Sequence, residues 1–215
     1  VGQISIPCVL LTNSAQELGY DNLSSLTTDD EAAAGQVVEY LAGQGHRHIG
    51  VLGGSWSCSQ SQISCRRIQG CRAALGRLGL PFDEGQCEPC RYSMAEGYAA
   101  ALRLLDRNPE LTAIFALSDV MAIGAIRALR DLGKRVPEDI SVVGYDGVGL
   151  SQYCVPRLTT VQQDTAVLAE QGVELLLGRI QGQLTQPVHQ TVPFRLVEGE
   201  SVARLDESMR GSAVL

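Results

Sequence analysis

The chain has 215 residues, of which 45% are hydrophobic and 19% are charged, and its formal net charge at pH 7 is −7. This length suffices for one large or two small domains with a buried core. The excess of carboxylates argues against a DNA-gripping surface on these residues, because phosphate binding needs clustered lysines and arginines. No apolar run reaches roughly 18 residues, so we expect no spanning helix and no membrane partner.

The first half of the chain alternates strand and helix patterns. Residues 8–12 form an apolar run of strand length, and Asp30 is placed to cap a helix that continues to about residue 42. A short strand is expected at 49–52. A serine-rich loop and a helix over about 61–78 follow, and Gly79 and Pro81 stop that helix.

The second half continues the alternation, which predicts an α/β fold with a parallel sheet covered on both faces. The helix patterns cover 93–105, 119–132 and about 165–181, and Gly133 closes the second of them. The strand patterns cover 113–117, 140–145, 158–162 and a stretch near 188–196.

Two polar residues follow strands of this predicted sheet. Asp146 ends the apolar run 140–145, and Gln163 follows the strand pattern at 158–162. Ligands of open α/β sheets bind at the carboxyl ends of the strands. We therefore expect Asp146 and Gln163 to face one cleft.

Several segments, in order, resemble the effector-binding domain of the lactose/galactose repressor family. They are GHRHIG at 45–50, RIQG at 67–70, AIFALSDVMAIGA at 113–125, VPED at 136–139 and ISVVGYDGVGLSQYCVPRLTTVQQD at 140–164. The resemblance spans about 6–202 and implies a bacterial transcription regulator with a periplasmic-binding-protein-like fold. That fold is a doubly wound parallel sheet lobe with a partial second lobe.

The resemblance also implies a division of the chain. Residues 1–28 are expected to be a remnant of the N-terminal lobe, and 29–160 to form the C-terminal-lobe-like effector-binding core with its crossover segments. Residues 161–205 are expected to hold the return segment and final strands, and 206–215 a flexible tail. Members of the family have further strand–helix units before the position of Ile6, so we expect a chain truncated at its N-terminus. Uncovered apolar faces then predict poor solubility of these residues alone.

Two ligand-binding residues follow from the resemblance with the most support. Arg67 stands three residues before Gly70, as the ligand-gripping arginine of the family does, and its forked donors suit hydroxyls or a carboxylate. Asp146 matches the acidic residue that accepts hydrogen bonds from sugars or purines in relatives. The alternatives are a surface arginine on a helix and an aspartate that forms a turn.

Four further positions match ligand contacts of the family less closely. Tyr92 presents an aromatic ring or packs in the core, and Ser118 contacts the ligand or caps a helix. Gln163 is a polar contact or hydrogen-bonds the start of a helix. Thr12 departs from the family, in which an aspartate is common at this position, so a specific sugar preference cannot be transferred.

The seven cysteines form an odd, scattered set, which favours free thiols in a reducing cytosol and a cytoplasmic protein. Cys87 and Cys90 have the spacing of half a zinc site or a redox pair, but no second ligand pair accompanies them. His46 and His48 belong to a turn before a strand, which favours structural use. Trp56 lies in a serine-rich loop and is expected to be partly buried rather than to line a cleft. We predict neither a metal site nor a cofactor.

The leading hypothesis is the ligand-sensing domain of a DNA-binding transcription regulator, a repressor by resemblance, whose effector is a sugar or nucleobase. Operator DNA would be bound by an N-terminal helix-turn-helix that none of these residues matches, and a homodimer is expected from the family. The alternative is an exported sugar-binding protein of a transporter or chemoreceptor, against which the unpaired cysteines argue. An enzyme ranks last, because the sequence has no catalytic residues in a G-x-S-x-G, G-x-G-x-x-G or Walker pattern.

Overall fold

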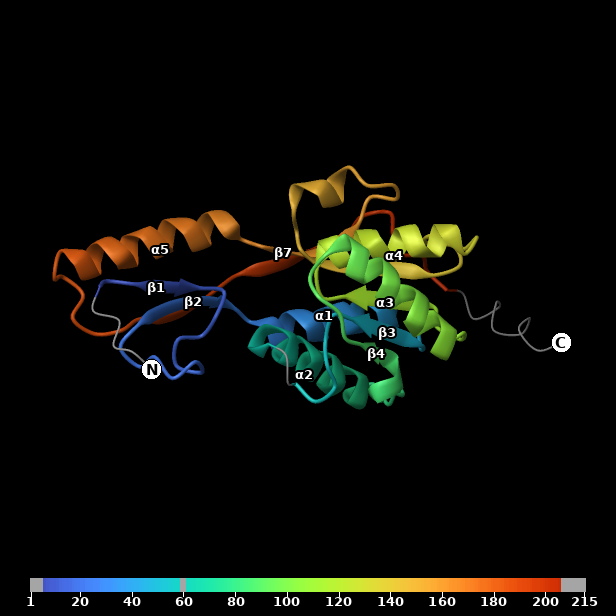
Figure 1. The fold of residues 1–215 in the computed structure, drawn as a ribbon, viewed down its shortest axis with the longest axis horizontal. Coiled ribbons are helices and arrows are strands. Elements are labelled where there is room, and N and C mark those ends of the chain that lie inside the picture. The colour runs from blue at the N-terminus through green and yellow to red at the C-terminus, as the bar shows by residue number, and fades with distance from the viewer. Residues whose placement is uncertain (1–5, 59–60, 206–215) are drawn as a thin grey trace. The chain divides into compact units, whose positions relative to one another are not determined.

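The computed structural model describes residues 6–58 and 61–205 (Figure 1). The described strands are β1 (Val9–Leu11), β2 (Ser24–Thr28), β3 (Ile49–Leu52), β4 (Cys87–Glu88), β5 (Ala113–Ala116), β6 (Ser141–Asp146), β7 (Thr159–Gln163), β8 (His189–Val192) and β9 (Phe194–Val197). The α-helices are α1 (Asp30–Gly43), α2 (Gln62–Arg77), α3 (Met94–Arg107), α4 (Asp119–Asp131) and α5 (Thr165–Ile180), and short 3-10 helices are η1 (Glu84–Gln86) and η2 (Gly149–Gln152).

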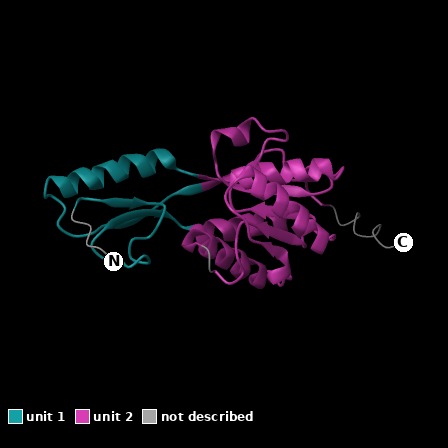
Figure 2. Cartoon of the chain, in the orientation of Figure 1, with its two compact units in different colours: residues 1–29, 163–194 teal, residues 30–162, 195–215 magenta. Residues whose placement is uncertain are grey.

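The chain divides into two compact units, which Figure 2 shows in different colours. The first unit holds 1–29 and 163–194, and the second holds 30–162 and 195–215. The return segment expected over 161–205 is therefore shared between the units. The tail expected at 206–215 lies outside the described residues.

The second unit is built on a six-stranded sheet in the order β4-β3-β5-β6-β7-β9. The four pairings from β4 to β7 are parallel, and Asp146 of β6 stands opposite Gln162 of β7. Helices α1 and α2 pack against each other, and so do α3 and α4 (Figure 1). This arrangement confirms the predicted α/β fold with a parallel sheet.

Burial explains why the central strands read as continuous apolar runs. Ile114 and Phe115 of β5, and Val142, Val143 and Tyr145 of β6, are fully buried. Strands covered by helices on both faces have no solvent side, so alternation with polar residues disappears.

Three of the described α-helices start at a capping side chain. Ser93, Ser118 and Asp164 accept hydrogen bonds from backbone N–H groups of Glu96, Met121 and Val167, three residues further on. Such caps satisfy N–H groups that the helix itself leaves without partners. The predicted starts of α3, α4 and α5 are thereby confirmed to within one residue.

The first unit has a three-stranded parallel sheet in the order β1-β2-β8. Helix α5 packs on β1 and β2. Its core is small and consists of Leu26, Leu168, Leu175 and Val192, with partly buried side chains around them.

Two strand predictions differ from the structure. The stretch near 188–196 is two strands, β8 and β9, which belong to different sheets and flank Pro193. Strand β2 was not predicted, because its residues SSLTT are mostly polar, although four of the five are buried. Ser24 and Ser25 instead use their hydroxyls, which contact the backbone N–H of Val188 and Nδ1 of His189.

The expectation that every cysteine is a free thiol is wrong. Cys58 and Cys65 form a disulfide that joins the serine-rich loop to the first turn of α2. An odd total excludes complete pairing but not a single local pair. Cys8, Cys71, Cys87, Cys90 and Cys154 carry free thiols.

Candidate functional site

Arg67 lies in the second unit, in the middle of α2, and is only 4% exposed. Its Nε donates to Asp30 Oδ1 at 2.8 Å, and its guanidinium carbon stands 3.4 Å from the centre of the Tyr145 ring. The Tyr145 hydroxyl donates to the same Asp30 oxygen at 2.8 Å. Burial alone would lower the pKa of Arg67, but the Asp30 charge raises it above its ordinary value. Arg67 is therefore a fixed positive charge rather than the surface arginine of the alternative reading.

Asp146 ends β6 at the carboxyl edge of the same sheet. Its Oδ1 lies 3.9 Å from Nη1 of Arg67, and its side chain is 32% exposed. Its backbone has a φ of 110°, a region that side chains other than glycine rarely occupy. Strained backbone of this kind persists where the surrounding structure holds it, often at functional sites.

Asp119, the first residue of α4, is fully buried. One of its oxygens accepts from Thr160 Oγ1 at 2.5 Å and the other from Val148 N at 2.8 Å. Burial raises the pKa of Asp119 to about 7, and the nearby charge of Asp146 adds to this, whereas the bonds from Thr160 and Val148 oppose it. Asp119 therefore joins α4 to β7 and to the turn after β6.

Tyr92 follows β4, and its hydroxyl lies 2.9 Å from Ser64 Oγ, one turn before Arg67 on α2. Its ring is partly exposed, so it is not the packed core tyrosine of the alternative reading. Burial of the hydroxyl raises the pKa of Tyr92. Arg67, Tyr92 and Asp146 thus come from the segments that follow or end β3, β4 and β6, at one edge of the sheet.

Ser118 follows β5 at this edge, but its side chain is committed to the start of α4. Its Oγ accepts from Met121 N at 3.3 Å and the residue is 1% exposed. This geometry favours the capping alternative for Ser118 over a direct ligand contact.

Gln163 and Thr12 lie in the first unit. Gln163 Oε1 accepts from Thr28 Oγ1, a residue of the same unit, at 3.0 Å. Thr12 follows β1 with a φ of 68°, and its hydroxyl donates to the carbonyl of Leu11 at 2.6 Å.

Sequence reasoning missed three members of this cluster, namely Asp30, Tyr145 and Ser64. Asp30, expected only to cap α1, accepts hydrogen bonds from Arg67 and Tyr145. The Ser64 hydroxyl is hydrogen-bonded to that of Tyr92. The spacing of three residues between Ser64 and Arg67 places both on one face of α2, and this signal was available. Nothing in the sequence connects Asp30 with Arg67, because 37 residues separate them.

Trp56 lies against α2. Its ring is stacked under the guanidinium of Arg72 at 3.9 Å and packs beside Phe82, with ring centres 5.5 Å apart. His46 is buried between Thr112 and Ala203, whose side-chain and carbonyl oxygens lie 3.0 and 3.1 Å from its ring nitrogens. Trp56 is therefore packed against other side chains and His46 has a structural role, as the sequence favoured.

Cys87 and Cys90 are buried, and burial raises the pKa of each thiol to about 12. Thiols that stay protonated at neutral pH are poor nucleophiles and poor metal ligands. Within 6–58 and 61–205, no group of three or more His, Cys, Asp or Glu side chains is arranged to hold a metal ion.

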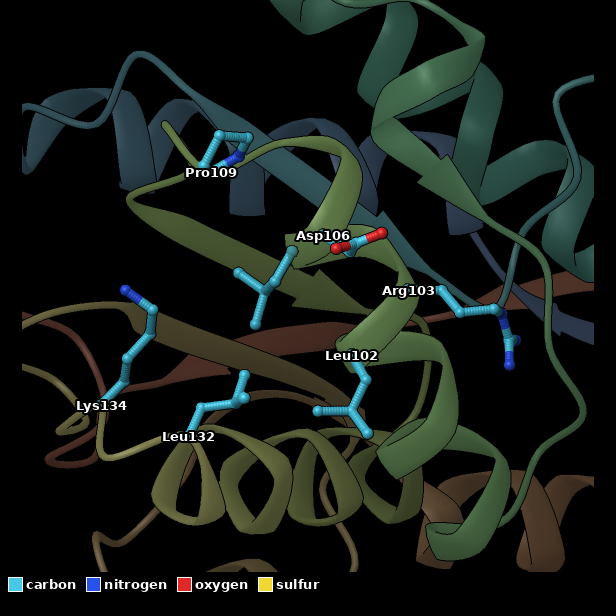
Figure 3. Close-up of a pocket in the computed structure, with 7 residues that line it drawn as sticks. Leu102, Arg103, Asp106, Pro109, Leu132 and Lys134 are labelled. Carbon is cyan, nitrogen blue, oxygen red and sulfur yellow. The ribbon is translucent and has the colours of Figure 1, made fainter.

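A pocket of about 560 Å³ lies at the other end of the helices, between the last turns of α3 and α4. Figure 3 shows Leu102 and Leu132 directed toward each other there, with Lys134 at its rim. Helices of a parallel α/β sheet run opposite to the strands, so their carboxyl ends mark the sheet edge away from Arg67 and Asp146. None of the ligand residues predicted from the sequence lines this pocket.

In the part of the chain that the structure covers, no helix combines the length and apolar character needed to cross a bilayer.

Comparison with known proteins adds a family match. Residues 38–202 match the family model described as "Periplasmic binding protein-like domain". Among curated proteins, the chain is 35% identical over 182 residues to the HTH-type transcriptional regulator CelR of Thermobifida fusca, which covers 84% of this chain and 52% of CelR. It is 34% identical over 198 residues to the HTH-type transcriptional repressor CytR of Escherichia coli K12, which covers 92% of this chain and 55% of CytR.

Solved structures of transcription regulators also match this chain. A CelR–cellobiose complex superposes with a TM-score of 0.81 at 31% identity, covering 90% of this chain and 64% of that one. A dimeric Lac repressor with a C-terminal deletion superposes with a TM-score of 0.82 at 30% identity, covering 94% and 71%. The chain spans about half the length of the curated relatives it matches.

Proposed function

Because this chain belongs to the periplasmic binding protein-like family, and within it to the lactose repressor family, we propose that it is the effector-sensing domain of a DNA-binding transcription regulator. The effector is a small sugar-like or purine-like molecule, and its binding changes the affinity for operator DNA. The relatives are HTH-type regulators, which supports this reading over that of an exported binding protein.

One observation carries the proposal. At the carboxyl edge of a parallel sheet, a buried guanidinium and a partly exposed carboxylate stand 3.9 Å apart, beside an aromatic ring. Arg67 supplies donors, Asp146 supplies acceptors, and Tyr92 supplies an apolar face. Small-molecule sites combine apolar walls with a few fixed polar groups of this kind, and the strand ends are where such sites occur in α/β sheets.

The effect on DNA is proposed as a population shift. An effector can favour one form of the regulator only by as much as it binds that form more tightly than the other. The DNA-contacting part is proposed to be a helix-turn-helix outside these residues, as the names of the relatives imply, and we propose repression as the mode because CytR is a repressor. Such a regulator works where the DNA is, so we also propose a cytoplasmic location.

We propose a homodimer as the assembled state. The segment after β6 exposes Tyr153 and Val155, at 84% and 86%, together with Leu150. Exposed apolar side chains gathered on one short segment are typical of a protein interface, and a dimeric Lac repressor superposes on this chain. Sedimentation of the Tyr153→Asp/Val155→Asp variant should show monomers. A dimer that persists in this variant would place the interface elsewhere.

We propose no enzymatic role, because the polar groups at the sheet edge are suited to binding. The similarity of the chain to transcription regulators supports this.

A thermal-shift screen of the protein against sugars, nucleosides and nucleobases tests the effector proposal. A ligand that binds only the folded state raises the midpoint temperature of unfolding by mass action. The Asp146→Asn variant should lose the shift, whereas Glu110→Gln, on an exposed loop of the same unit, should keep it. An equal shift in both variants would contradict the assignment of Asp146.

A further inference from the structure

We propose that Cys58 and Cys65 are a reversible redox site, which glutathione disulfide closes to a disulfide and reduced glutathione opens to two thiols. The state of this pair sets the order of the first turn of α2 and, through Ser64, the affinity of the effector site. The second part rests on the proposed function, because it requires a cytoplasmic regulator whose effector contacts Tyr92. The redox chemistry itself can be tested without an effector.

The pair differs from the other cysteines in its bonding and its accessibility. The remaining five of the seven are free thiols, and Cys71, Cys87 and Cys90 among them are buried. Cys58 and Cys65 are only partly buried, so a small thiol can reach their sulfurs. Disulfides of cytosolic proteins are mostly transient or redox-sensing, and accessible ones are the labile class. In a cytoplasmic protein, one accessible disulfide among free thiols is therefore suited to a reversible site.

The two cysteines stay close enough to close again after they open. Their Cα atoms are 4.6 Å apart, within the range of roughly 4.4–6.8 Å found for disulfides. Only seven positions separate them in the sequence, so closing the pair orders a short loop at a small entropic cost. Each also has a backbone hydrogen bond of its own segment, from Cys58 N to Ser55 O at 3.0 Å and from Cys65 N to Ser61 O at 2.9 Å.

Closure by glutathione disulfide is a balanced exchange. One cysteine of the pair attacks glutathione disulfide as a thiolate, breaks its S–S bond and releases one glutathione. The second cysteine attacks the mixed disulfide, forms the Cys58–Cys65 bond and releases the other glutathione. The pair loses two electrons and two protons, which the two glutathione molecules carry away as thiols. Reduced glutathione reverses both steps.

The start of α2 lacks the features that hold the starts of other helices. Ser93, Ser118 and Asp164 cap their helices with side chains, whereas within the described residues Ser61 makes no such bond to α2. The first turn of α2, which the structure describes in full, has no acidic residue to offset the positive end of the helix. Such a start frays unless another interaction holds it.

Two further features of this segment cost free energy in the closed form. Gln62 is the first residue of α2, and its Oε1 is buried without a hydrogen-bond partner among the described residues. Cys58 has a φ of 57°, in the left-handed region that side chains other than glycine rarely adopt. The covalent bond to Cys65 offsets these costs because it ties the turn to the helix. When the bond opens, the turn and Gln62 can relax, and the first turn of α2 loosens.

The loosened turn affects the candidate site through Ser64. This residue directly precedes Cys65, and its hydroxyl lies 2.9 Å from that of Tyr92. Arg67, further along α2, is held by its own buried ion pair. Opening of the disulfide should therefore release Tyr92 while Arg67 stays in place. Only the fraction of open molecules with an ordered turn can then bind an effector directly, so the closed form binds more tightly.

Alkylation followed by mass spectrometry measures the redox state. The protein is equilibrated at varied ratios of reduced glutathione to glutathione disulfide, and free thiols are then blocked with iodoacetamide. We expect the pair to be closed in glutathione disulfide and open in excess reduced glutathione, with Cys71 unmodified in both. A pair that stays closed in excess reduced glutathione is a permanent crosslink. That result, or a pair that never closes, would overturn the proposal.

Hydrogen exchange tests the effect on α2. Backbone amides of residues 61–66 should exchange at least roughly fivefold faster in the open form, whereas the last turn of α2 should not change. The Cys58→Ser/Cys65→Ser variant should behave like the open form in either buffer. The Cys8→Ser/Cys154→Ser control should respond like the unchanged protein. Equal exchange in the two redox forms would show that the disulfide does not hold the start of α2, contrary to the proposal.

Effector binding separates this proposal from the function on which it rests. Titration calorimetry with ribose, cellobiose and adenosine should show that a probe that binds does so roughly threefold to tenfold more tightly to the closed form. Equal affinity of the two forms refutes the coupling, while loss of binding in Asp146→Asn still supports the proposed function. If no probe binds, or if Asp146→Asn binds normally, the proposed effector site is refuted, and the exchange of α2 alone decides the redox site.

Discussion

Nη1 of Arg67 lies 3.9 Å from Oδ1 of Asp146, whereas Nε of the same guanidinium is bonded to Asp30 at 2.8 Å. Arg67 is thus fixed from behind by Asp30 and Tyr145 while one edge of it approaches the carboxylate at the end of β6. The residue supports the core and the candidate site at once. Its replacement is therefore a poor test of ligand binding alone.

Removing Arg67 should lower the free energy of unfolding. Arg67→Met leaves the Asp30 carboxylate buried without its positive partner, and we expect a loss of about 3–5 kcal/mol. Urea denaturation of Arg67→Met and of Arg67→Met/Asp30→Asn measures this. The double variant should be the more stable of the two. If Arg67→Met is as stable as the unchanged protein, the ion pair is not the main support of this cluster.

Gly144 should resist replacement. A Cβ at Gly144 would lie 2.3 Å from Asp119 Oδ1 and 2.7 Å from Leu158 Cδ2, so the buried carboxylate would have to move. We expect Gly144→Ala to lower the free energy of unfolding by about 1–3 kcal/mol. Gly76→Ala, on α2 with no atom within 4 Å of the new Cβ, is the control and should gain about 0.5–1 kcal/mol. Equal effects in chemical denaturation would contradict this packing.

Stability should fall in mild acid through His46. Burial lowers the pKa of His46 to about 4, although the hydrogen bond to Ala203 opposes this. The folded-state pKa lies below the unfolded value of about 6.5, so the contribution is complete above pH 6.5 and is lost as the pH falls toward 4. The loss amounts to about 3 kcal/mol. Unfolding measured from pH 7.5 to 4 should show a weaker pH dependence in His46→Gln, and an unchanged dependence would exclude His46 as the source.

The cysteines should fall into three chemical groups. Native protein treated with iodoacetamide at pH 8 should be modified first at Cys8 and more slowly at Cys154, because both are partly exposed but burial raises the pKa of the Cys154 thiol. Mild reduction should add Cys58 and Cys65. Cys71, Cys87 and Cys90 should react only after unfolding, because they are buried and burial raises the pKa of each thiol. Peptide mass spectrometry reads each position, and rapid native labelling of Cys87 would be inconsistent with this arrangement.

The first unit should associate through α5 when these residues are prepared alone. Val173, Leu177 and Ile180 are exposed and lie at spacings of four and three residues, on one side of the helix. Light scattering should detect species larger than a dimer, and Leu177→Gln/Ile180→Gln should reduce them. Glu174→Gln serves as the control. A well-behaved sample without these species would show that the stripe is not adhesive.

Most of the fold could be predicted from the sequence because periodicity and capping are local signals. The apolar runs of β3, β5 and β6 and the capping residues Ser93, Ser118 and Asp164 marked their elements within one or two residues. β2 was not predicted because its serines and threonines are polar, and only tertiary contacts bury them. The Cys58–Cys65 pair was missed because a total count says nothing about a pairing over seven residues.

The site could be predicted less completely. The resemblance pointed to Arg67, Tyr92 and Asp146, which the structure places at one sheet edge. The polar groups behind them were not predictable in their roles, because Asp30 meets Arg67 and Thr160 meets Asp119 only after distant segments pack. Ser118 could not be assigned for a different reason. A serine at this position fits both a helix cap and a ligand contact, and only its hydrogen bond from Met121 N decides between the two.

The position of Asp119 has a thermodynamic consequence for ligand recognition. Its pKa of about 7 is raised mainly by burial and in part by the negative charge of Asp146. An effector that changes the field of Asp146 or the water around it shifts that pKa, so near neutral pH binding is coupled to the uptake or release of protons. The heat of association should then vary with the ionisation enthalpy of the buffer, and the slope gives the net number of protons exchanged, which Asp119→Asn should reduce.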